Sequence, residues 1–269
     1  MTDLSRSASA LDGAVTSATA IPQLSRAAEL TLRDAYRIQA LCSDLRVARG
    51  DVLVGAKLGF TSKAKAAQMG VSDVIVGRLH ASMAYAAGGA VPLAALIHPR
   101  IEPEVAFRLG TAVDLRRSAD PVGELRAAVD AVAPALEIID SRYLDFRFSL
   151  ADVIADNTSA GGFVVGGWTP ADLGSNPPAI GGRPVTLEFD GAVAASGNTD
   201  DILGDPCLAV PVIARLGAAQ RIALPAGAVL LAGGATAAVP LTPGATVTVT
   251  ITGFGTASVT ATGAPRGGR

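Results

Sequence analysis

The stretch HPRIEPEVAF, residues 98–107, places Glu102 and Glu104 one residue apart in an otherwise apolar run. Side chains at positions i and i+2 of a β-strand point to the same face, so the two carboxylates are expected side by side. Burying one carboxylate without a partner costs free energy, and burying two together costs more. Pro103 removes a hydrogen-bond donor, which is typical of an edge strand or a bulge. The stretch therefore predicts a half-buried strand with a positive group beside it.

A third glutamate, Glu137, lies in the apolar segment PALEIID, residues 134–140. Three carboxylates with no histidine or cysteine nearby form a set of hard oxygen ligands, which suits Mg²⁺ or Mn²⁺ better than zinc. The alternative is that the glutamates form ordinary surface ion pairs with Arg100 and Arg142, because exposed glutamates at this spacing are common on strands. Spacing alone leaves both interpretations open.

Lys57 lies between the apolar segments VLVGA and LGF. Its side chain either extends from a strand end toward water or lies in a pocket as an acid, a base or a cation. Gly55 and Gly59 on either side would let a substrate approach the backbone. The histidines are His80 and His98 alone, and no G-x-S-x-G motif is present, so a Ser-His-Asp triad is poorly supported.

Composition excludes several classes of protein. The chain has 269 residues, 49% of them hydrophobic and 17% charged, with a net charge of −2, so no basic excess indicates nucleic-acid binding. Cys42 and Cys207 lie far apart without metal-binding spacing and fit a reduced, cytoplasmic protein. The N-terminus lacks the pattern of a signal peptide, and no run of about 18 apolar residues suggests a membrane span.

Periodicity predicts an α+β fold with a helical N-terminal part over residues 1–80 and a β-rich part over residues 81–269, together one compact domain. Helices are expected in residues 14–20, 30–50, 62–70, 123–132 and 205–216, with Ser62 as an N-cap. Short strands separated by Gly, Pro, Asn and Asp clusters are expected elsewhere, notably in VLVGAKLGFTS, PALEIID, GGFVVGG, PVTLEFDG, VLLAGG and the Thr/Val alternation near residues 246–251.

Several long motifs together resemble the hydratase/decarboxylase branch of the fumarylacetoacetate hydrolase superfamily. They are GAKLGFTSKAKAAQMGVSDVIVGRL, HPRIEPEVAF and PALEIIDSRYLDFRFSLADVIADNTSAGGFVVGG, with weaker likeness in DAYRIQ and GDPCLAV. The resemblance covers roughly residues 14–260. It implies a mixed, rolled β-sheet around the active site and a divalent metal, usually Mg²⁺, on Glu102, Glu104 and Glu137. Lys57 matches the active-site lysine of K-x-G-x-T-S.

The same resemblance implies a lyase acting on a small 2-oxo acid in aromatic-compound catabolism. Ser62, Arg78 and Gly234 are expected to bind substrate, with Arg78 assigned to a distal carboxylate from its charge alone. No histidine precedes residue 80, where the hydrolases of the superfamily carry one, so C–C bond hydrolysis is disfavoured.

Two activities remain in view: decarboxylation of 2-oxohex-3-enedioate (4-oxalocrotonate) and hydration of 2-hydroxypenta-2,4-dienoate. Ile75 stands where the hydratases carry an aspartate, and the segment from Asp73 to Leu79 resembles the decarboxylase form D-x-I-W-G-R-L except at Val76, so decarboxylation is favoured. Val76, His80 and LLAGGAT depart from the usual pattern and keep a related lyase of another pathway open. The resemblance also implies a homo-oligomer and association with a related hydratase; a non-enzymatic alternative is an inactive partner subunit of that hydratase.

Overall fold

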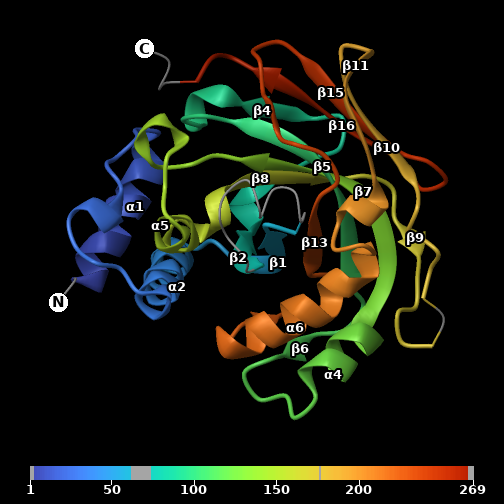
Figure 1. Ribbon diagram of the computed structural model, residues 1–269, viewed down its shortest axis with the longest axis horizontal. Helices are drawn as coiled ribbons and strands as arrows, with labels where there is room; N and C mark the ends of the chain where they lie inside the picture. The colour runs from blue at the N-terminus through green and yellow to red at the C-terminus, as the bar shows by residue number, and fades with distance from the viewer. Residues whose placement is uncertain (1–2, 62–73, 176, 266–269) are drawn as a thin grey trace.

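The computed structural model describes residues 3–61, 74–175 and 177–265. Helices surround a large sheet, and a second sheet covers one end of it (Figure 1). The α-helices in the described part of the chain are α1 (Leu4–Ser17), α2 (Leu32–Ala48), α4 (Pro121–Ala128), α5 (Leu150–Ala155) and α6 (Ala209–Ala219).

The large sheet is mixed and strongly curved, and its strands follow the order β2-β1-β13-β5-β7-β8-β3. Strand β14 also pairs with β5, and β9 pairs with β7. Pairing is antiparallel except between β1 and β13 and between β3 and β8. The expected mixed, rolled sheet is therefore confirmed. The bounds are β1 (Leu53–Gly59), β2 (Ile75–His80), β3 (Ala84–Tyr85), β5 (Arg100–Leu109), β7 (Val129–Ile139), β8 (Ala160–Val165), β9 (Thr169–Pro170), β13 (Val229–Gly234) and β14 (Val239–Pro240).

A second sheet has the order β11-β10-β15-β16-β4 and packs over the large one. In β15 the residues TVTVTI alternate between exposed or half-buried threonine and buried Val or Ile, as the sequence pattern predicts for a strand with one wet face. A short pair joins β12 and β6. The bounds are β4 (Ala90–Pro92), β6 (Val113–Asp114), β10 (Pro184–Phe189), β11 (Ala192–Asn198), β12 (Ala223–Leu224), β15 (Thr246–Ile251) and β16 (Gly255–Thr262).

Helices cover two sides of this framework. Helices α1, α2 and α5 pack together around Tyr143 and Ile38, whereas α4 and α6 pack on each other at another edge. The strands β1 and β2 belong to the same sheet as β5 and β7. A boundary at residue 80 would separate β1 and β2 from the other strands of this sheet. We therefore propose that the helical part and the β-rich part form one domain.

The expected helices agree with the structure to different degrees. The helix expected over residues 30–50 is confirmed as α2, and the strand expected in VLVGAKLGFTS is confirmed as β1, each slightly shorter than predicted. The helix expected over residues 123–132 ends at Ala128, because the chain becomes extended at Val129 and continues as β7, which pairs with β5. The helix expected over 205–216 begins later, at Ala209, after a 3₁₀ turn. The expected N-terminal helix lies earlier, as α1, and residues 62–70 lie outside the described residues.

One stretch, Thr199–Ala219, is long and apolar enough to cross a membrane by length and composition alone. Its α-helix, α6, has 11 residues. At 1.5 Å per residue this helix is about 16 Å long, far short of the hydrocarbon core of about 30 Å. Val210, Ile213 and Ala214 are buried in the main core, so we interpret the stretch as a core segment of the fold.

A pair of glycine substitutions tests the packing of β1. A Cβ atom at Gly55 would lie 2.0 Å from the carbonyl oxygen of Val229, so Gly55 serves close strand pairing. We expect Gly55→Ala to lower the free energy of unfolding by about 3 kcal/mol in urea denaturation. A Cβ atom at Gly13, on the exposed side of α1, would meet nothing within 4 Å, so Gly13→Ala should raise stability by up to about 1 kcal/mol. Equal effects would contradict this explanation.

Candidate metal centre and active site

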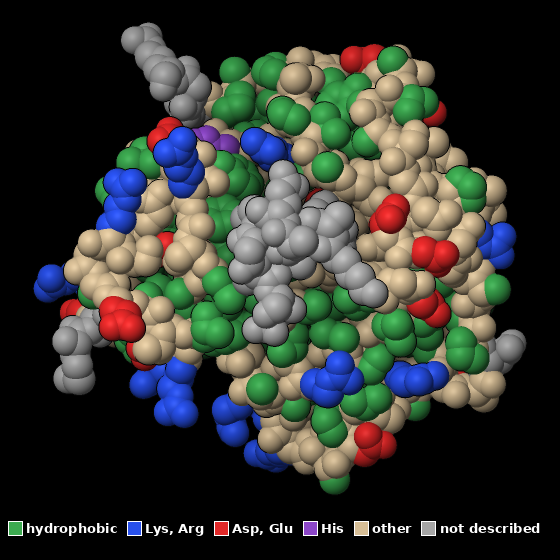
Figure 2. Space-filling model, in the orientation of Figure 1, with side chains coloured by type: hydrophobic (Ala, Val, Ile, Leu, Met, Phe, Trp, Pro, Cys, Tyr) green, Lys and Arg blue, Asp and Glu red, His purple; other side chains and the backbone are tan. Residues whose placement is uncertain are grey.

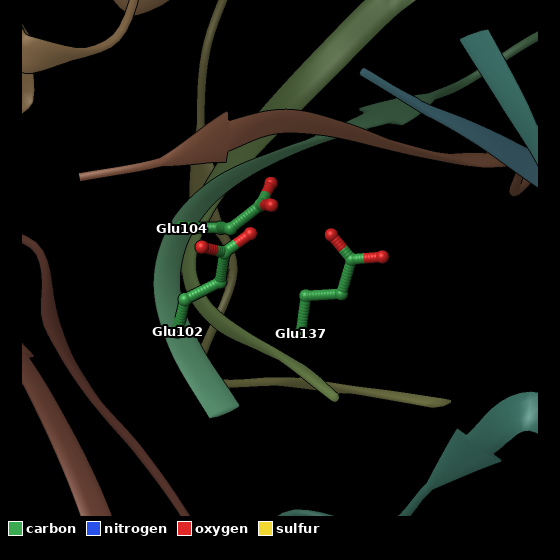
Figure 3. A group of neighbouring side chains, drawn as sticks. All are labelled: Glu102, Glu104 and Glu137. Atoms are coloured by element: carbon green, nitrogen blue, oxygen red, sulfur yellow. The ribbon is translucent and has the colours of Figure 1, made fainter. Parts of the chain in front are cut away.

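Three buried glutamates converge on one face of the large sheet. Strand β5 places Glu102 and Glu104 on the same face, and its register with β7 sets Glu102 directly opposite Glu137. One carboxylate oxygen from each glutamate lies within 4.8 Å of those from the others (Figure 3). Glu104 and Glu137 are 0% exposed and Glu102 is 8% exposed. The interpretation of these residues as ordinary surface ion pairs is therefore wrong.

Pro103 is accommodated in a way that the sequence does not reveal. It lies in β5, between β13 and β7, rather than on the expected edge strand. The carbonyl of Pro103 accepts a hydrogen bond from Ala235 N at 2.8 Å, so the missing N–H faces the side where β13 ends at Gly234. The register between β13 and β5 also shifts there, which agrees with the expected bulge. The irregularity brings Gly233 N to 2.7 Å from Oε2 of Glu104.

The electrostatics of the cluster favour a divalent cation. Burial, together with the neighbouring carboxylates, raises the pKa of Glu104 well above its usual value, and burial also raises that of Glu137. Oε1 of Glu104 and Oε2 of Glu137 are buried and accept no hydrogen bond from the described residues. Three ionised glutamates and one protonated lysine, Lys57, carry a net charge of −2. An ion of charge +2 with a preference for oxygen ligands would neutralise the site and satisfy these oxygens.

Lys57 is held inside this cluster as a cation. From β1 its Nζ lies 2.8 Å from Oε1 of Glu137 and donates to the carbonyl of Thr158 at 3.1 Å. Burial lowers the pKa of Lys57, but the charges of Glu137 and Glu104 outweigh burial and leave that pKa above its ordinary value. A lysine kept protonated in this way can orient an anion or donate a proton, and it is a poor nucleophile for Schiff-base formation.

The turn that receives Lys57 is strained. Asn157, Thr158 and Ser159 have φ values of 51°, 57° and 54°, the left-handed region that non-glycine residues rarely adopt. Asn157 stabilises the turn by accepting from the backbone N–H of Arg78 and donating to its carbonyl, both at 2.8 Å. Strain of this kind persists where surrounding contacts enforce it, and it concentrates at functional sites. The sequence ADNTS predicts that Asn157 and Ser159 build a turn, whereas the contact of Thr158 with Lys57 was not predicted.

A cavity of about 340 Å³ opens beside the carboxylates. Lys57 and Glu102 lie on its wall, together with Gly234, which was expected to bind substrate. Gly59 also lines the cavity, so its expected closeness to substrate fits, whereas Gly55 packs against β13. The remaining lining residues are Leu58, Phe60, Thr61, Arg100, Ile139, Phe146, Phe148, Val153, Thr158, Ser159, Ala237 and Ala238.

Arg100 lies on the cavity wall, whereas its sequence context predicted only an ion-pair partner for the glutamates. Its guanidinium carbon lies 5.0 Å from the centroid of the Phe146 ring. Among the described residues of the cavity wall, Arg100 and Lys57 are the basic ones. The signal was its position, two residues before Glu102, where strand alternation places it on the face of the glutamates.

Arg78 does not join this site. Its guanidinium donates to Oε1 of Gln39 at 2.5 Å and to the carbonyl of Gln220 at 3.0 Å, and the residue lines a different cleft. Arg78 was expected to bind the substrate from its charge alone, and strand direction explains the difference. Lys57 and Gly77 are register partners on neighbouring strands, so the next residue, Arg78, points to the opposite face. Ser62 lies outside the described residues.

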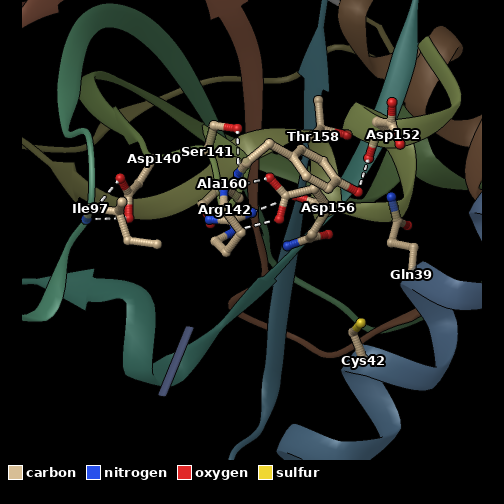
Figure 4. Close-up of polar contacts among 12 residues, drawn as sticks. Gln39, Cys42, Ile97, Asp140, Ser141, Arg142, Asp152, Asp156, Thr158 and Ala160 are labelled. Atoms are coloured by element: carbon tan, nitrogen blue, oxygen red, sulfur yellow. Dashed lines mark hydrogen bonds and ion pairs between the residues drawn. The ribbon is translucent and has the colours of Figure 1, made fainter. Parts of the chain in front are cut away.

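A second buried network supports the strand that carries Glu137 (Figure 4). Arg142 forms an ion pair with Asp156 and donates to the carbonyl of Ala160 at 3.0 Å. Asp140 accepts backbone N–H bonds from Ile97 and His98. The expected ion-pair role of Arg142 is thus real, but its partner is Asp156 rather than a glutamate of the cluster.

The two histidines lie outside the cavity wall. His80 is buried with Nε2 2.9 Å from the hydroxyl of Ser43, and Nε2 of His98 lies 3.1 Å from the carbonyl of Tyr143. Burial lowers the pKa of His80 to about 4, and the charge of Arg46 adds to the effect. The position of His80 in the fold therefore indicates a neutral, structural imidazole.

Acidification should reveal this buried histidine. Its folded pKa lies below the unfolded value of 6.5, so its contribution to stability is present above pH 6.5 and is lost as the pH falls toward 4. The stability difference between the wild type and His80→Asn should shrink by up to about 1.4 kcal/mol per pH unit across this range. Urea denaturation at several pH values measures the difference; a difference independent of pH would contradict the buried neutral state.

Comparison with known proteins agrees with this geometry. Residues 52–261 match the model of the family described as "Fumarylacetoacetate (FAA) hydrolase C-terminal". The chain is 48% identical over 235 residues to a 4-oxalocrotonate decarboxylase from Pseudomonas sp. The aligned region covers 87% of this chain and 89% of the relative. It is 38% identical over 208 residues to a 2-keto-4-pentenoate hydratase from Burkholderia vietnamiensis, covering 74% of each.

A solved structure is also similar over nearly the whole chain. It is 4-oxalocrotonate decarboxylase from Pseudomonas putida G7, complexed with magnesium and adipate, with a TM-score of 0.86 and 35% identity over 96% of this chain and 97% of that one. These relatives are decarboxylases and hydratases acting on small acids, as the sequence motifs indicated. The chain belongs to the fumarylacetoacetate hydrolase family.

Proposed function

We propose that the protein decarboxylates 2-oxohex-3-enedioate (4-oxalocrotonate) to 2-hydroxypenta-2,4-dienoate in aromatic-compound catabolism, with Mg²⁺ as its metal and Mn²⁺ as a substitute. The observation that carries the proposal is one cavity lined by Glu102, Lys57 and Arg100, with Glu104 and Glu137 in the same buried carboxylate cluster as Glu102. The substrate has a 2-oxo acid at one end and a second carboxylate at the other. The relative of known structure was solved with magnesium and adipate, a six-carbon dicarboxylate, which supports the same class of ligand.

The site residues divide between the two ends of such a substrate. Glu102, Glu104 and Glu137 would hold a divalent cation, which supplies Lewis-acid stabilisation of the negative charge that develops on the 2-oxo oxygen. Lys57, kept protonated by Glu137, is placed to donate from Nζ to the same end of the substrate. Arg100 is the basic side chain available to the distal carboxylate, in place of the Arg78 expected from sequence.

The reaction itself requires electron flow along the conjugated chain. The bond between C5 and C6 breaks, and carbon dioxide leaves from C6. The electron pair forms the C4–C5 double bond, the C3–C4 double bond shifts to C2–C3, and negative charge reaches the 2-oxygen. Lys57 delivers a proton from Nζ to that oxygen, which gives the 2-hydroxydienoate. Phe146 and Phe148 line the cavity wall and exclude water from this path.

Removing the charge of Arg100 should separate dicarboxylate from monocarboxylate binding. We expect Arg100→Gln to weaken adipate binding about tenfold to hundredfold in the presence of Mg²⁺, because a charge-assisted hydrogen bond is lost. Hexanoate, which lacks the second carboxylate, should bind both forms alike. Calorimetry measures both ligands, and Arg147→Gln removes an exposed charge outside the cavity wall as a control. Equal losses for both ligands would assign Arg100 a different role.

Hydration of 2-hydroxypenta-2,4-dienoate is the alternative activity. At the position where the hydratases carry an aspartate, this chain has Ile75, which is 2% exposed and packs in the core with Tyr143. No carboxylate is therefore supplied from that position, which favours decarboxylation. Purified protein with Mg²⁺ is given each substrate separately, and carbon dioxide release and loss of diene absorbance are followed. Release from 2-oxohex-3-enedioate supports the proposal, whereas turnover of the dienoate alone supports the hydratase.

We also propose a cytoplasmic homo-oligomer that associates with a related hydratase. The two free thiols, Cys42 and Cys207, support a reducing compartment. Strand β11 forms one edge of the second sheet, and its Val193 is 59% exposed, which supports pairing with another chain. Retention of all three glutamates and Lys57 argues against an inactive partner subunit. Light scattering of the protein alone and mixed with a related hydratase tests both associations.

A further inference from the structure

The cleft that contains Arg78 lies apart from the proposed active site. Its volume is about 950 Å³, and it shares no lining residue with the glutamate cavity among the described residues. One wall is a single face of α2, and another is formed by the end of α6 and the chain that follows it. Figure 2 shows Lys and Arg side chains gathered around the notch at the lower left, in the region that α2 and α6 occupy in Figure 1. We refer to it as the α2–α6 cleft.

Positive charge dominates this cleft. Five arginines line it, and Asp44 is its one carboxylate among the described lining residues. Arg116 is paired with Asp114 at 2.7 Å, but none of the other four forms an ion pair within the described part of the chain. Unpaired charges of one sign on facing walls repel each other and attract a ligand of opposite sign. The five arginines are Arg33, Arg37, Arg78, Arg116 and Arg221.

The buried member of the group is Arg78, which is 7% exposed. A guanidinium has five N–H donors, and the side chain of Arg78 uses two of them on described residues, one on Gln39 and one on the carbonyl of Gln220. Both of these acceptors are neutral, and burial lowers the pKa of Arg78. The charge of Asp44 in the same cleft only partly offsets the burial of Arg78, so a ligand that supplies acceptor oxygens would stabilise this guanidinium.

The other walls suit the remainder of an organic anion. Arg33 and Arg37 are about one helical turn apart on α2, so both side chains can bind the same anionic group of a ligand. Leu32, Val47 and Ile222 add apolar surface to the same cleft. Guanidinium groups bind phosphate and carboxylate oxygens with two parallel hydrogen bonds, which makes arginine the preferred residue for such ligands.

We propose that the α2–α6 cleft is a second binding site, which takes a small, multiply charged oxyanion bearing phosphate or carboxylate groups between Arg33, Arg37 and Arg78. This site is separate from the proposed decarboxylase centre. The proposal therefore stands or falls independently of the catalytic activity.

Calorimetry on the full chain tests the site, with pyrophosphate as the phosphate probe and citrate as the carboxylate probe. Metal ions are removed beforehand on a chelating resin, because soluble EDTA is itself a multiply charged carboxylate that would compete with the probes. Lys57 and Arg100 offer positive charge in the glutamate cavity as well, so the variants of the cleft decide which site binds the probe. We expect one-to-one binding of at least one probe. The double variant R33A/R37A should weaken it about tenfold or more. Arg6→Ala, which removes an exposed charge of α1, is the matched control and should leave binding unchanged.

The outcomes separate the two ligand classes and can overturn the site. Binding of pyrophosphate alone identifies a phosphate ligand, binding of citrate alone identifies a carboxylate ligand, and binding of both supports the shared oxyanion chemistry. Binding of neither probe overturns the proposal, and so does binding that R33A/R37A leaves unchanged. The rim variants avoid the buried Arg78, whose replacement could unfold the chain.

Discussion

Replacing Glu104 with glutamine (E104Q) is expected to abolish metal-dependent turnover and to leave the metal-free fold at least as stable. Lewis-acid stabilisation by a metal ion contributes several kcal/mol to a transition state, so its loss lowers kcat by about 10³-fold or more. The metal-free protein, by contrast, loses one of three buried carboxylates that repel one another. The glutamine side chain retains an oxygen that can accept the hydrogen bond of Gly233, so the strand geometry persists.

Two measurements check this prediction. Steady-state decarboxylation gives the activity, and thermal denaturation with and without Mg²⁺ gives the stability. Mg²⁺ should raise the melting temperature of the wild type, because it binds only the folded state, and should have little effect on E104Q. Glu124→Gln on the exposed surface of α4 is the control and should behave like the wild type. Activity of E104Q near the wild-type level would show that Glu104 holds no catalytic metal.

Replacing Lys57 with methionine (K57M) should damage both activity and stability. Methionine fills a similar volume but leaves Glu137 without its cation inside the protein. Breaking a buried ion pair from one side typically costs about 3–5 kcal/mol. The proton donor of the proposed reaction is also lost, and proton transfer by a positioned group typically contributes about 10²- to 10⁴-fold. We therefore expect a metal-free protein destabilised by about 3 kcal/mol or more and an activity lowered by about 10²-fold or more.

A double variant separates the two effects. In K57M/E137Q the buried charge that K57M leaves behind is removed, so much of the lost stability should return, whereas activity should not. Urea denaturation in EDTA and steady-state kinetics measure the two quantities. If K57M/E137Q is as unstable as K57M, then Lys57 stabilises the fold through contacts other than its ion pair with Glu137.

Much of the metal centre could be predicted from sequence because its signal is local. Glu102 and Glu104 share a strand face by simple alternation, and Glu137 stands out as a charge in an apolar segment. The register that sets Glu102 opposite Glu137 depends on long-range pairing between β5 and β7, which no local pattern encodes. The resemblance to a known family supplied that missing step.

The distal end of the site was harder to predict for the same reason. Arg78 and Arg100 are both arginines on strands, and charge alone does not tell which one faces the cavity. The answer follows from strand direction: Arg78 follows Gly77, the register partner of Lys57, whereas Arg100 alternates in step with Glu102. A turn was expected from Asn157 and Ser159, but its left-handed conformation was not, because contacts with β2 and Lys57 help to impose it.

The most direct test of the central claim is a crystal structure of the protein grown with Mn²⁺, using anomalous scattering to locate the ion. A single anomalous peak bonded to oxygens of Glu102, Glu104 and Glu137, beside Nζ of Lys57, is the predicted result. The claim would be contradicted if, at saturating Mn²⁺, the three carboxylates contacted only one another or Lys57 and the ion were absent or bound elsewhere.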